Sequence, residues 1–93
     1  MKKVYKNKAE SILPATAKQR YYIAHLIFST NTFKDLKEKI QNKFGGFNAE
    51  NDFGLYLKTP GLLTKKEALY LIQCLLARDK REVNKIFKIK KIL

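Results

Sequence analysis

One stretch of this 93-residue sequence decides its fold class: Leu63-Thr64-Lys65-Lys66-Glu67-Ala68-Leu69-Tyr70-Leu71-Ile72-Gln73-Cys74-Leu75. Thr64 stands three residues before Glu67, which is the spacing of a capping box. In that motif the threonine hydroxyl accepts from the N–H group three residues on, and the glutamate accepts from the threonine N–H. The pattern predicts a helix from Lys65 to about Ala77. As the most apolar segment it is expected at the centre, with these residues buried: Ala68, Leu69, Ile72, Leu75 and Leu76.

Two further stretches carry the same signal. Thr16-Ala17-Lys18-Gln19 is a second complete capping box, and it predicts a helix from about Ala17 to Phe28. Thr32-Phe33-Lys34-Asp35 has the same spacing with the shorter aspartate, and it predicts a helix over roughly Phe33 to Lys43. Gly45-Gly46 then ends that helix, because glycine readily adopts the positive φ of a helix stop.

The other segments allow more than one interpretation. Asp79-Lys80-Arg81-Glu82 either caps a fourth helix, which we expect to reach about residue 88, or continues the helix before it, and residues 87–90 also alternate like a strand. Residues 53–57 alternate as a short extended segment does, and Lys58-Thr59-Pro60-Gly61 suits a type II turn. The expected fold is mainly α: a single domain over 1–93 with a bundle of three to four helices and an extended segment near 53–57. Residues 1–12 are expected to form a mobile basic arm, and 78–93 a basic C-terminal helix or tail.

Composition excludes several classes of protein. An apolar fraction of 45% is typical of a globular chain, and no apolar run approaches the roughly 18–20 residues of a membrane span. The basic residues at the start precede no apolar stretch, so we expect no secretion signal. A single cysteine, Cys74, fits a reducing compartment. We therefore expect a cytoplasmic protein.

The sequence offers no catalytic set. His25 is its one histidine and Cys74 its one cysteine, so neither a Cys/His pair nor a zinc site is indicated. Asn48 to Gly54 alternates oxygen-bearing side chains as a calcium loop does, but the glycine is misplaced and Thr59 stands where such a loop needs glutamate. We expect no enzyme, no cofactor and no metal.

Charge is the strongest functional signal. The formal net charge is +12, with 17 lysines and 3 arginines against 8 acidic residues. The predicted nucleic-acid-binding residues gather at the two ends: Arg78, Arg81, Lys85, Lys88, Lys90, Lys91, Lys2, Lys3 and Lys6. On a helix Arg78, Arg81, Lys85 and Lys88 would form one stripe, and lysine favours phosphate contact over base reading. Mostly non-specific binding of DNA or RNA, single or double stranded, is therefore expected.

Other interpretations of the charge remain open. A solvated lysine-rich face is the simplest of them, and a basic tail on anionic lipid is another. Five aromatic side chains are candidates for stacking on unpaired bases, although such residues are more often part of the core: Tyr21, Tyr22, Phe47, Phe53 and Tyr56. The sequence leaves the oligomeric state undecided.

Two segments, covering about 25 of the 93 residues, resemble a known module. Residues 15–26 are similar to Thr-x-x-Gln-x-x-Tyr-Ile-x-x-Leu, and residues 63–75 to Leu-Thr-Lys-x-Glu-Ala-x-x-x-Ile-x-x-Leu, with Leu69 where a small residue is usual. This pair resembles a small helical module of phage and mobile-element proteins, sometimes appended to DNA-recombination or helicase-like proteins. The resemblance implies a helical fold and a phage or mobile-element origin. Short lysine-rich proteins of that origin include anti-CRISPR inhibitors of host defence, which contact a protein or its guide RNA. An inhibitor of a host protein–nucleic acid complex is therefore the alternative function.

Overall fold

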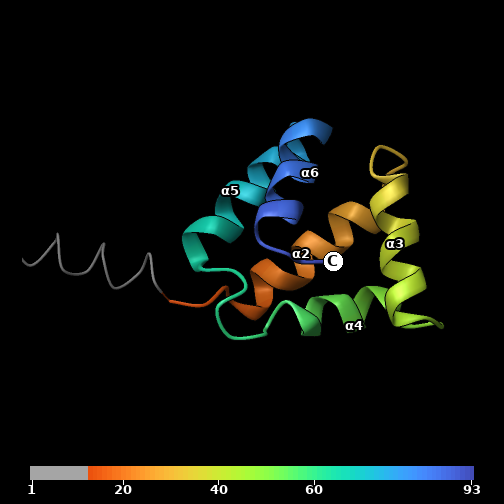
Figure 1. Ribbon diagram of the computed structural model, residues 1–93, viewed down its shortest axis with the longest axis horizontal. Coiled ribbons are helices and arrows are strands. Elements are labelled where there is room, and N and C mark those ends of the chain that lie inside the picture. Colours follow the sequence, from red (N-terminus) through yellow and green to blue (C-terminus); the bar gives the residue numbers. More distant parts are fainter. Residues whose placement is uncertain (1–12) are drawn as a thin grey trace, which may run out of the picture.

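The computed structural model describes residues 13–93, so the arm predicted over 1–12 lies outside the described residues. The described chain folds into five helices (Figure 1). They are α2 (Ala17–Phe28), α3 (Lys34–Phe44), α4 (Ala49–Tyr56), α5 (Lys65–Leu76) and α6 (Lys80–Ile89). Within residues 13–93 no strand forms, and β-pairing is limited to an isolated antiparallel bridge between Pro14 and Thr64. The expected mainly α class is confirmed, but the expected count of three to four helices is wrong.

Both complete capping boxes form as predicted. The Gln19 N–H donates to the Thr16 hydroxyl and the Thr16 N–H to the Gln19 side chain, each at 3.1 Å. The Glu67 N–H donates to the Thr64 hydroxyl at 3.2 Å, and the Thr64 N–H donates to Glu67 Oε1 at 2.9 Å. The third predicted cap is wrong, because the N-cap of α3 is Phe33 and not Thr32, and it makes no side-chain cap hydrogen bond. α3 therefore begins after a buried phenylalanine and not after a threonine cap.

The extended segment expected near 53–57 is wrong, because these residues belong mostly to α4. Phe53 and Leu57 lie four residues apart and both are buried, whereas Leu55 between them is exposed. Helical spacing buries the two together on one face, and an extended strand would have buried Leu55 with them. The predicted turn forms one residue later, over Thr59 to Leu62, with Gly61 at φ 79° and the Leu62 N–H donating to the Thr59 carbonyl at 3.1 Å.

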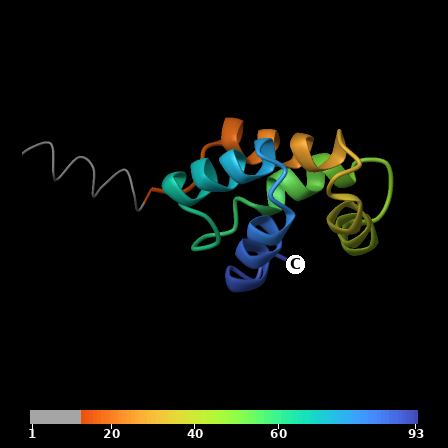
Figure 2. The ribbon, with the colours of Figure 1, turned by 90° about the horizontal axis from the view of Figure 1, so that it is seen from above.

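The central helix is α2, which corrects the expectation that α5 would be. α2 packs against α3, α4 and α5, while α6 packs mainly on α5 and places Phe87 against Phe53 of α4 (Figures 1 and 2). In both views α3 lies at one end of the molecule and α5 at the other. Leu69 and Leu76 of α5 were expected to be buried but are 51% and 55% exposed. α5 is therefore a covering helix with one apolar face left open.

Two close contacts join α2 to α4. Gly54 lies under the ring of Tyr21, so that a Cβ added there would come within 2.7 Å of Tyr21 Cε1. The Arg20 guanidinium is buried and donates from Nη1 to the Gly54 carbonyl at 2.9 Å. That carbonyl lies in the last turn of α4, where the helix leaves acceptors unpaired and favours a positive charge. Arg20 thus completes the end of α4.

The junction of α5 and α6 is a helix stop followed by a new cap. Arg78 has φ 57°, its N–H donates to the Leu75 carbonyl at 3.1 Å, and the Asp79 N–H donates to the Cys74 carbonyl at 3.0 Å. This pair of bonds is a Schellman motif, which ends α5. The Asp79 side chain then accepts from the Glu82 N–H at 3.1 Å and starts α6. Of the two interpretations, a separately capped fourth helix is the one that forms, and residues 87–90 are not a strand.

Candidate nucleic-acid interface

α6 presents a core face and a cationic face. Val83 and Phe87 are buried, while Arg81, Lys85 and Lys88 are exposed and recur four and three residues apart. A helix turns once in 3.6 residues, so these three side chains follow one line along it for about 10 Å. That length matches roughly three nucleotide steps of a duplex strand. We call these three residues the α6 stripe.

Within residues 13–93, the side chains of the α6 stripe form no ion pair. In this range Lys90 Nζ pairs with Glu67 Oε2 at 2.8 Å, and His25 Nδ1 lies 3.7 Å from Glu50 Oε2. Neither contact includes a residue of the stripe, whose three side chains are exposed to water. Cations in this state release counterions when they neutralise phosphates, and that release drives non-specific binding.

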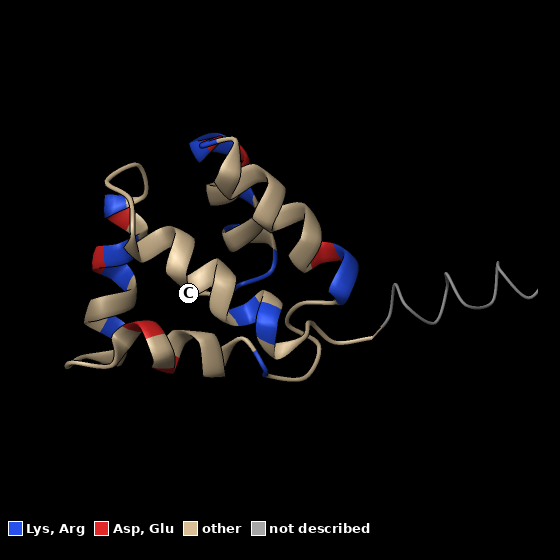
Figure 3. Ribbon diagram, turned by 180° about the vertical axis from the view of Figure 1, so that it is seen from behind, with Lys and Arg blue, Asp and Glu red and all other residues tan. Residues whose placement is uncertain are grey.

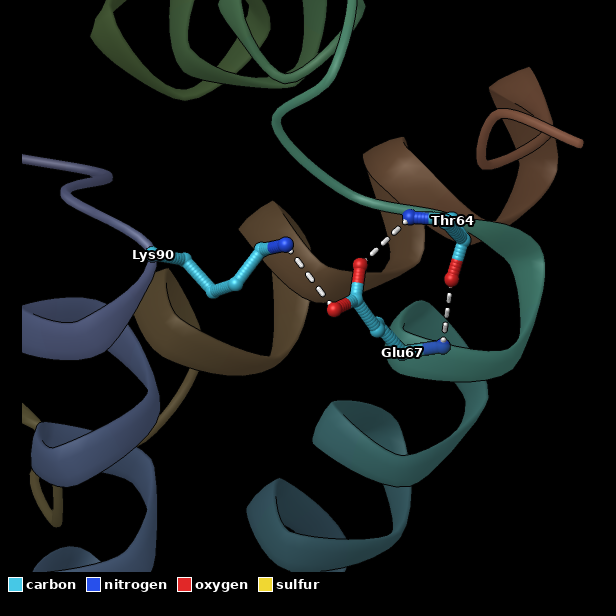
Figure 4. Close-up of polar contacts among 3 residues, drawn as sticks. All are labelled: Thr64, Glu67 and Lys90. Carbon is cyan, nitrogen blue, oxygen red and sulfur yellow. Dashed lines mark hydrogen bonds and ion pairs between the residues drawn. The ribbon is translucent and has the colours of Figure 1, made fainter. Parts of the chain in front are cut away.

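Lys90 is placed differently from the stripe. Its Nζ lies 2.8 Å from Glu67 Oε2, and its side chain is 25% exposed (Figure 4). Partial burial on its own raises the pKa of the Glu67 carboxyl. The hydrogen bonds from Lys90 and the Thr64 N–H outweigh burial and hold that pKa below its ordinary value of 4.5. Lys90 therefore ties the end of α6 to the capping box of α5.

Arg78 and Lys91 lie at helix ends. Arg78 was expected to continue the stripe, but its left-handed backbone places it outside α6, so that expectation is wrong. Lys91 has φ 53° and ends α6 as Arg78 ends α5, with the Ile92 N–H donating to the Phe87 carbonyl at 3.0 Å. Both side chains are exposed beside helix C-termini, where positive charge is favourable. The predicted contacts Lys2, Lys3 and Lys6 lie outside the described residues.

One cation near the stripe was missed by sequence reasoning. Lys39 of α3 lines the same hollow as Lys88 and Asn84 of α6, a space of ≈ 290 Å³. Asp35 is the one carboxylate among the lining residues. Lys39 stands in a segment of mixed charge, so nothing in its local sequence sets it apart. Only the packing of the helices brings it to the end of the stripe.

The aromatic candidates for base stacking separate into two groups. Phe53 is fully buried with its ring 6.1 Å from that of Phe87, so it cannot stack on a base. Tyr21 and Tyr22 are 40% and 42% exposed, and Phe47 is fully exposed. Tyr56 is half-buried and carries the Lys43 ammonium 4.4 Å above its ring centre. Tyr22 and Phe47 are therefore the more open candidates, because the Tyr21 ring packs on Gly54 and the Tyr56 ring on Lys43.

The remaining reactive side chains are dispersed. Burial raises the pKa of the Cys74 thiol, and nearby Glu82 and Asp79 add to that shift, so the thiol stays protonated. The described residues include no group of three or more His, Cys, Asp or Glu side chains that would hold a metal ion. No helix in the described part of the chain is long and apolar enough to cross a bilayer.

A scan of protein-family models and searches among curated proteins and solved structures find no match to this chain.

Proposed function

We propose that this chain is a small non-enzymatic nucleic-acid-binding protein of phage or mobile-element origin. The observation that carries the proposal is the α6 stripe, in which Arg81, Lys85 and Lys88 are exposed, aligned and without a carboxylate partner among residues 13–93. The excess of lysine over arginine supports contact with phosphates rather than reading of bases. The stripe therefore favours a backbone binder with little sequence preference.

Other cations extend the proposed contact. Arg78 and Lys91 lie just before and after α6, and Lys39 lies across the hollow from Lys88. Lys2, Lys3 and Lys6 add charge from the N-terminal arm. Lys90 has a smaller proposed share, because Glu67 already neutralises it. The long-range field of a chain with net charge +12 speeds encounter with a polyanion.

Salt dependence is the measurement that tests this function. Fluorescence anisotropy with labelled random DNA and RNA oligonucleotides, single and double stranded, gives the affinity across a salt series. If three phosphates are neutralised on a duplex, the affinity should fall about 40-fold between roughly 50 and 200 mM salt. Absence of binding at about 50 mM salt would refute the proposal, because phosphate contacts are then strongest.

A matched pair of variants locates the contact. The triple variant Arg81→Gln, Lys85→Gln, Lys88→Gln removes the α6 stripe, and it should weaken binding at least about tenfold. The slope of log affinity against log salt concentration should become shallower by the equivalent of roughly three phosphate contacts. The control removes the same charge from exposed lysines on other elements: Lys18→Gln, Lys34→Gln and Lys58→Gln. An equal loss in both variants would mean that net charge alone, and not the stripe, drives binding.

A second candidate function is a phage-encoded inhibitor of a host-defence nucleoprotein. Leu69, Tyr70 and Leu76 of α5 favour it, because about half of each side chain is exposed on one helix. A pull-down from host lysate, with and without nuclease, separates the two candidates. Partners lost after nuclease treatment support nucleic-acid binding, and a stoichiometric protein retained after treatment supports the inhibitor.

A further inference from the structure

Among the described residues 13–93, nothing covers one apolar face of α5. Leu69, Tyr70 and Leu76 are 51%, 49% and 55% exposed, and Gln73 between them is exposed as well. The sequence holds no charged residue from Ala68 to Ala77, and Figure 3 shows α5 without charge between its ends. Exposed apolar residues scattered singly are ordinary, but a run of them on one helix marks an interaction surface. We call Leu69, Tyr70, Gln73 and Leu76 the α5 face.

A groove continues this surface onto α6. Tyr70 lines it together with Ile86 and Ile89 of α6, and it encloses ≈ 310 Å³. Ile89 is 66% exposed, so its side chain forms an open apolar wall. The ion pair of Lys90 with Glu67 lies at the same groove and holds the two helices together there. The groove is therefore a fixed hollow that accepts an apolar side chain beside Tyr70.

Charged side chains lie at both ends of the apolar surface of α5. Lys65 and Lys66 precede Leu69, and Arg78 and Lys80 follow Leu76. Of the nearby carboxylates, Glu67 is paired with Lys90, whereas Asp79 at the cap of α6 and Glu82 beside Tyr70 offset the two cations that follow Leu76. The surface is therefore apolar in the middle and positive at the end beside Leu69, so a complementary partner has an apolar stripe with acidic residues next to it.

We propose that the α5 face and the adjoining groove bind an acidic amphipathic α-helix of a partner protein. Leu69 and Leu76 lie seven residues apart, about 10 Å along α5, which is the span of anchors at i, i+4 and i+7 on a bound helix. A second copy of this chain is disfavoured by the repulsion between two chains that each carry a net charge of +12. The surface does not depend on nucleic-acid binding, since Arg81, Lys85 and Lys88 lie outside it.

Peptides of defined charge test this proposal. The probe is a labelled helical peptide of about 18 residues with leucines at i, i+4, i+7 and i+11 and glutamate and glutamine elsewhere. Its controls are a scrambled peptide of the same composition and one with lysine in place of glutamate. At about 150 mM salt the acidic amphipathic peptide should bind at least about tenfold tighter than either control. Amide shifts should gather at residues 66–77 and 86–90 of the ¹⁵N-labelled protein.

Two leucine variants give the matched comparison. Leu76→Gln, and Leu69→Gln as a second variant, should each weaken peptide binding about fivefold or more, because an apolar anchor loses its contact. Leu55→Gln should change it less than about twofold, since this leucine is equally exposed, at 57%, but lies on α4. Circular dichroism checks that all three variants remain folded.

Four results would overturn the proposal. The first is equal affinity for the acidic and scrambled peptides, and the second is an equal loss of peptide binding in Leu55→Gln and Leu76→Gln. The third is binding to anionic phosphatidylglycerol vesicles that Leu76→Gln abolishes while it leaves peptide binding unchanged. The fourth is self-association of the protein that Leu76→Gln abolishes. The third result would assign the surface to lipid and the fourth to a second copy of the chain.

Discussion

Replacing Gly54 by alanine should destabilise the fold, although alanine is the better helix former. Gly54 lies inside α4, where the exchange by itself favours the helix by about 1 kcal/mol. The added methyl group, however, would come within 2.7 Å of Tyr21 Cε1 and 3.3 Å of Tyr21 Cγ. Because Cγ is the root of the ring, the clash cannot be relieved by moving the far end of the side chain alone. Either the ring leaves its rotamer or α4 moves away from α2.

The clash should outweigh the gain in helix propensity. Adding a methyl group to a closely packed contact costs about 1–3 kcal/mol. Movement of α4 would also stretch the hydrogen bond from Arg20 to the Gly54 carbonyl, and a buried bond from a charged group contributes about 1.5–3 kcal/mol. Subtracting the favourable 1 kcal/mol from the clash leaves a loss of about 0–2 kcal/mol, and partial loss of the hydrogen bond adds about 1 kcal/mol, so we expect a net loss of about 1–3 kcal/mol. For a chain of this size that corresponds to a fall in Tm of roughly 4–24 °C.

A double-mutant cycle with Tyr21→Ala tests the cause. Urea unfolding followed by circular dichroism gives the free energy of unfolding of the wild type, each single variant and the double variant. Without the Tyr21 ring, Gly54→Ala should become neutral or stabilise by up to about 1 kcal/mol. Asn51→Ala, on the exposed side of the same helix, is the control for helix propensity. Stabilisation by Gly54→Ala in the wild-type background, or the same effect in both backgrounds, would refute the packing argument.

Three further predictions concern caps and helix ends. Thr64→Ala should lower the free energy of unfolding in urea by about 1 kcal/mol, whereas Thr32→Ala, which removes no cap bond, should cost less than about 0.5 kcal/mol. Lys91→Gly should raise the urea midpoint by relieving a positive φ of 53°, a gain of about 0.5–1 kcal/mol, and no change would contradict it. Glu67→Gln should reduce the loss in free energy of unfolding that the wild type shows when the pH is lowered through the acid range. The lowered Glu67 pKa means that the carboxylate stabilises the fold above 4.5 and loses this effect as the pH falls through the folded value, so an unchanged loss in the variant would count against the Lys90 pair.

The part of the candidate site that could be predicted lies within one helix. Arg81, Lys85 and Lys88 share a face because helical periodicity puts them there whatever the rest of the chain does. Arg78 is not part of the stripe, because its own left-handed backbone and the Asp79 cap separate α6 from α5. Lys39 and Lys90 depend on contacts between helices, and no local pattern predicts these.

The sequence by itself determined where two helices begin and that the fold is mainly α. The capping boxes at Thr16 and Thr64 and the Pro60-Gly61 turn involve groups within three residues of one another, so their hydrogen bonds form from local geometry alone. Tertiary structure decided burial: Phe53 and Leu57 became helical because one face of α4 packs on α2 and α3. It also left Leu69 and Leu76 exposed, because α2 occupies the centre and no other helix within residues 13–93 covers the outer side of α5. An apolar pattern states which side chains gain from burial, but only the arrangement of neighbouring helices decides which of them are covered.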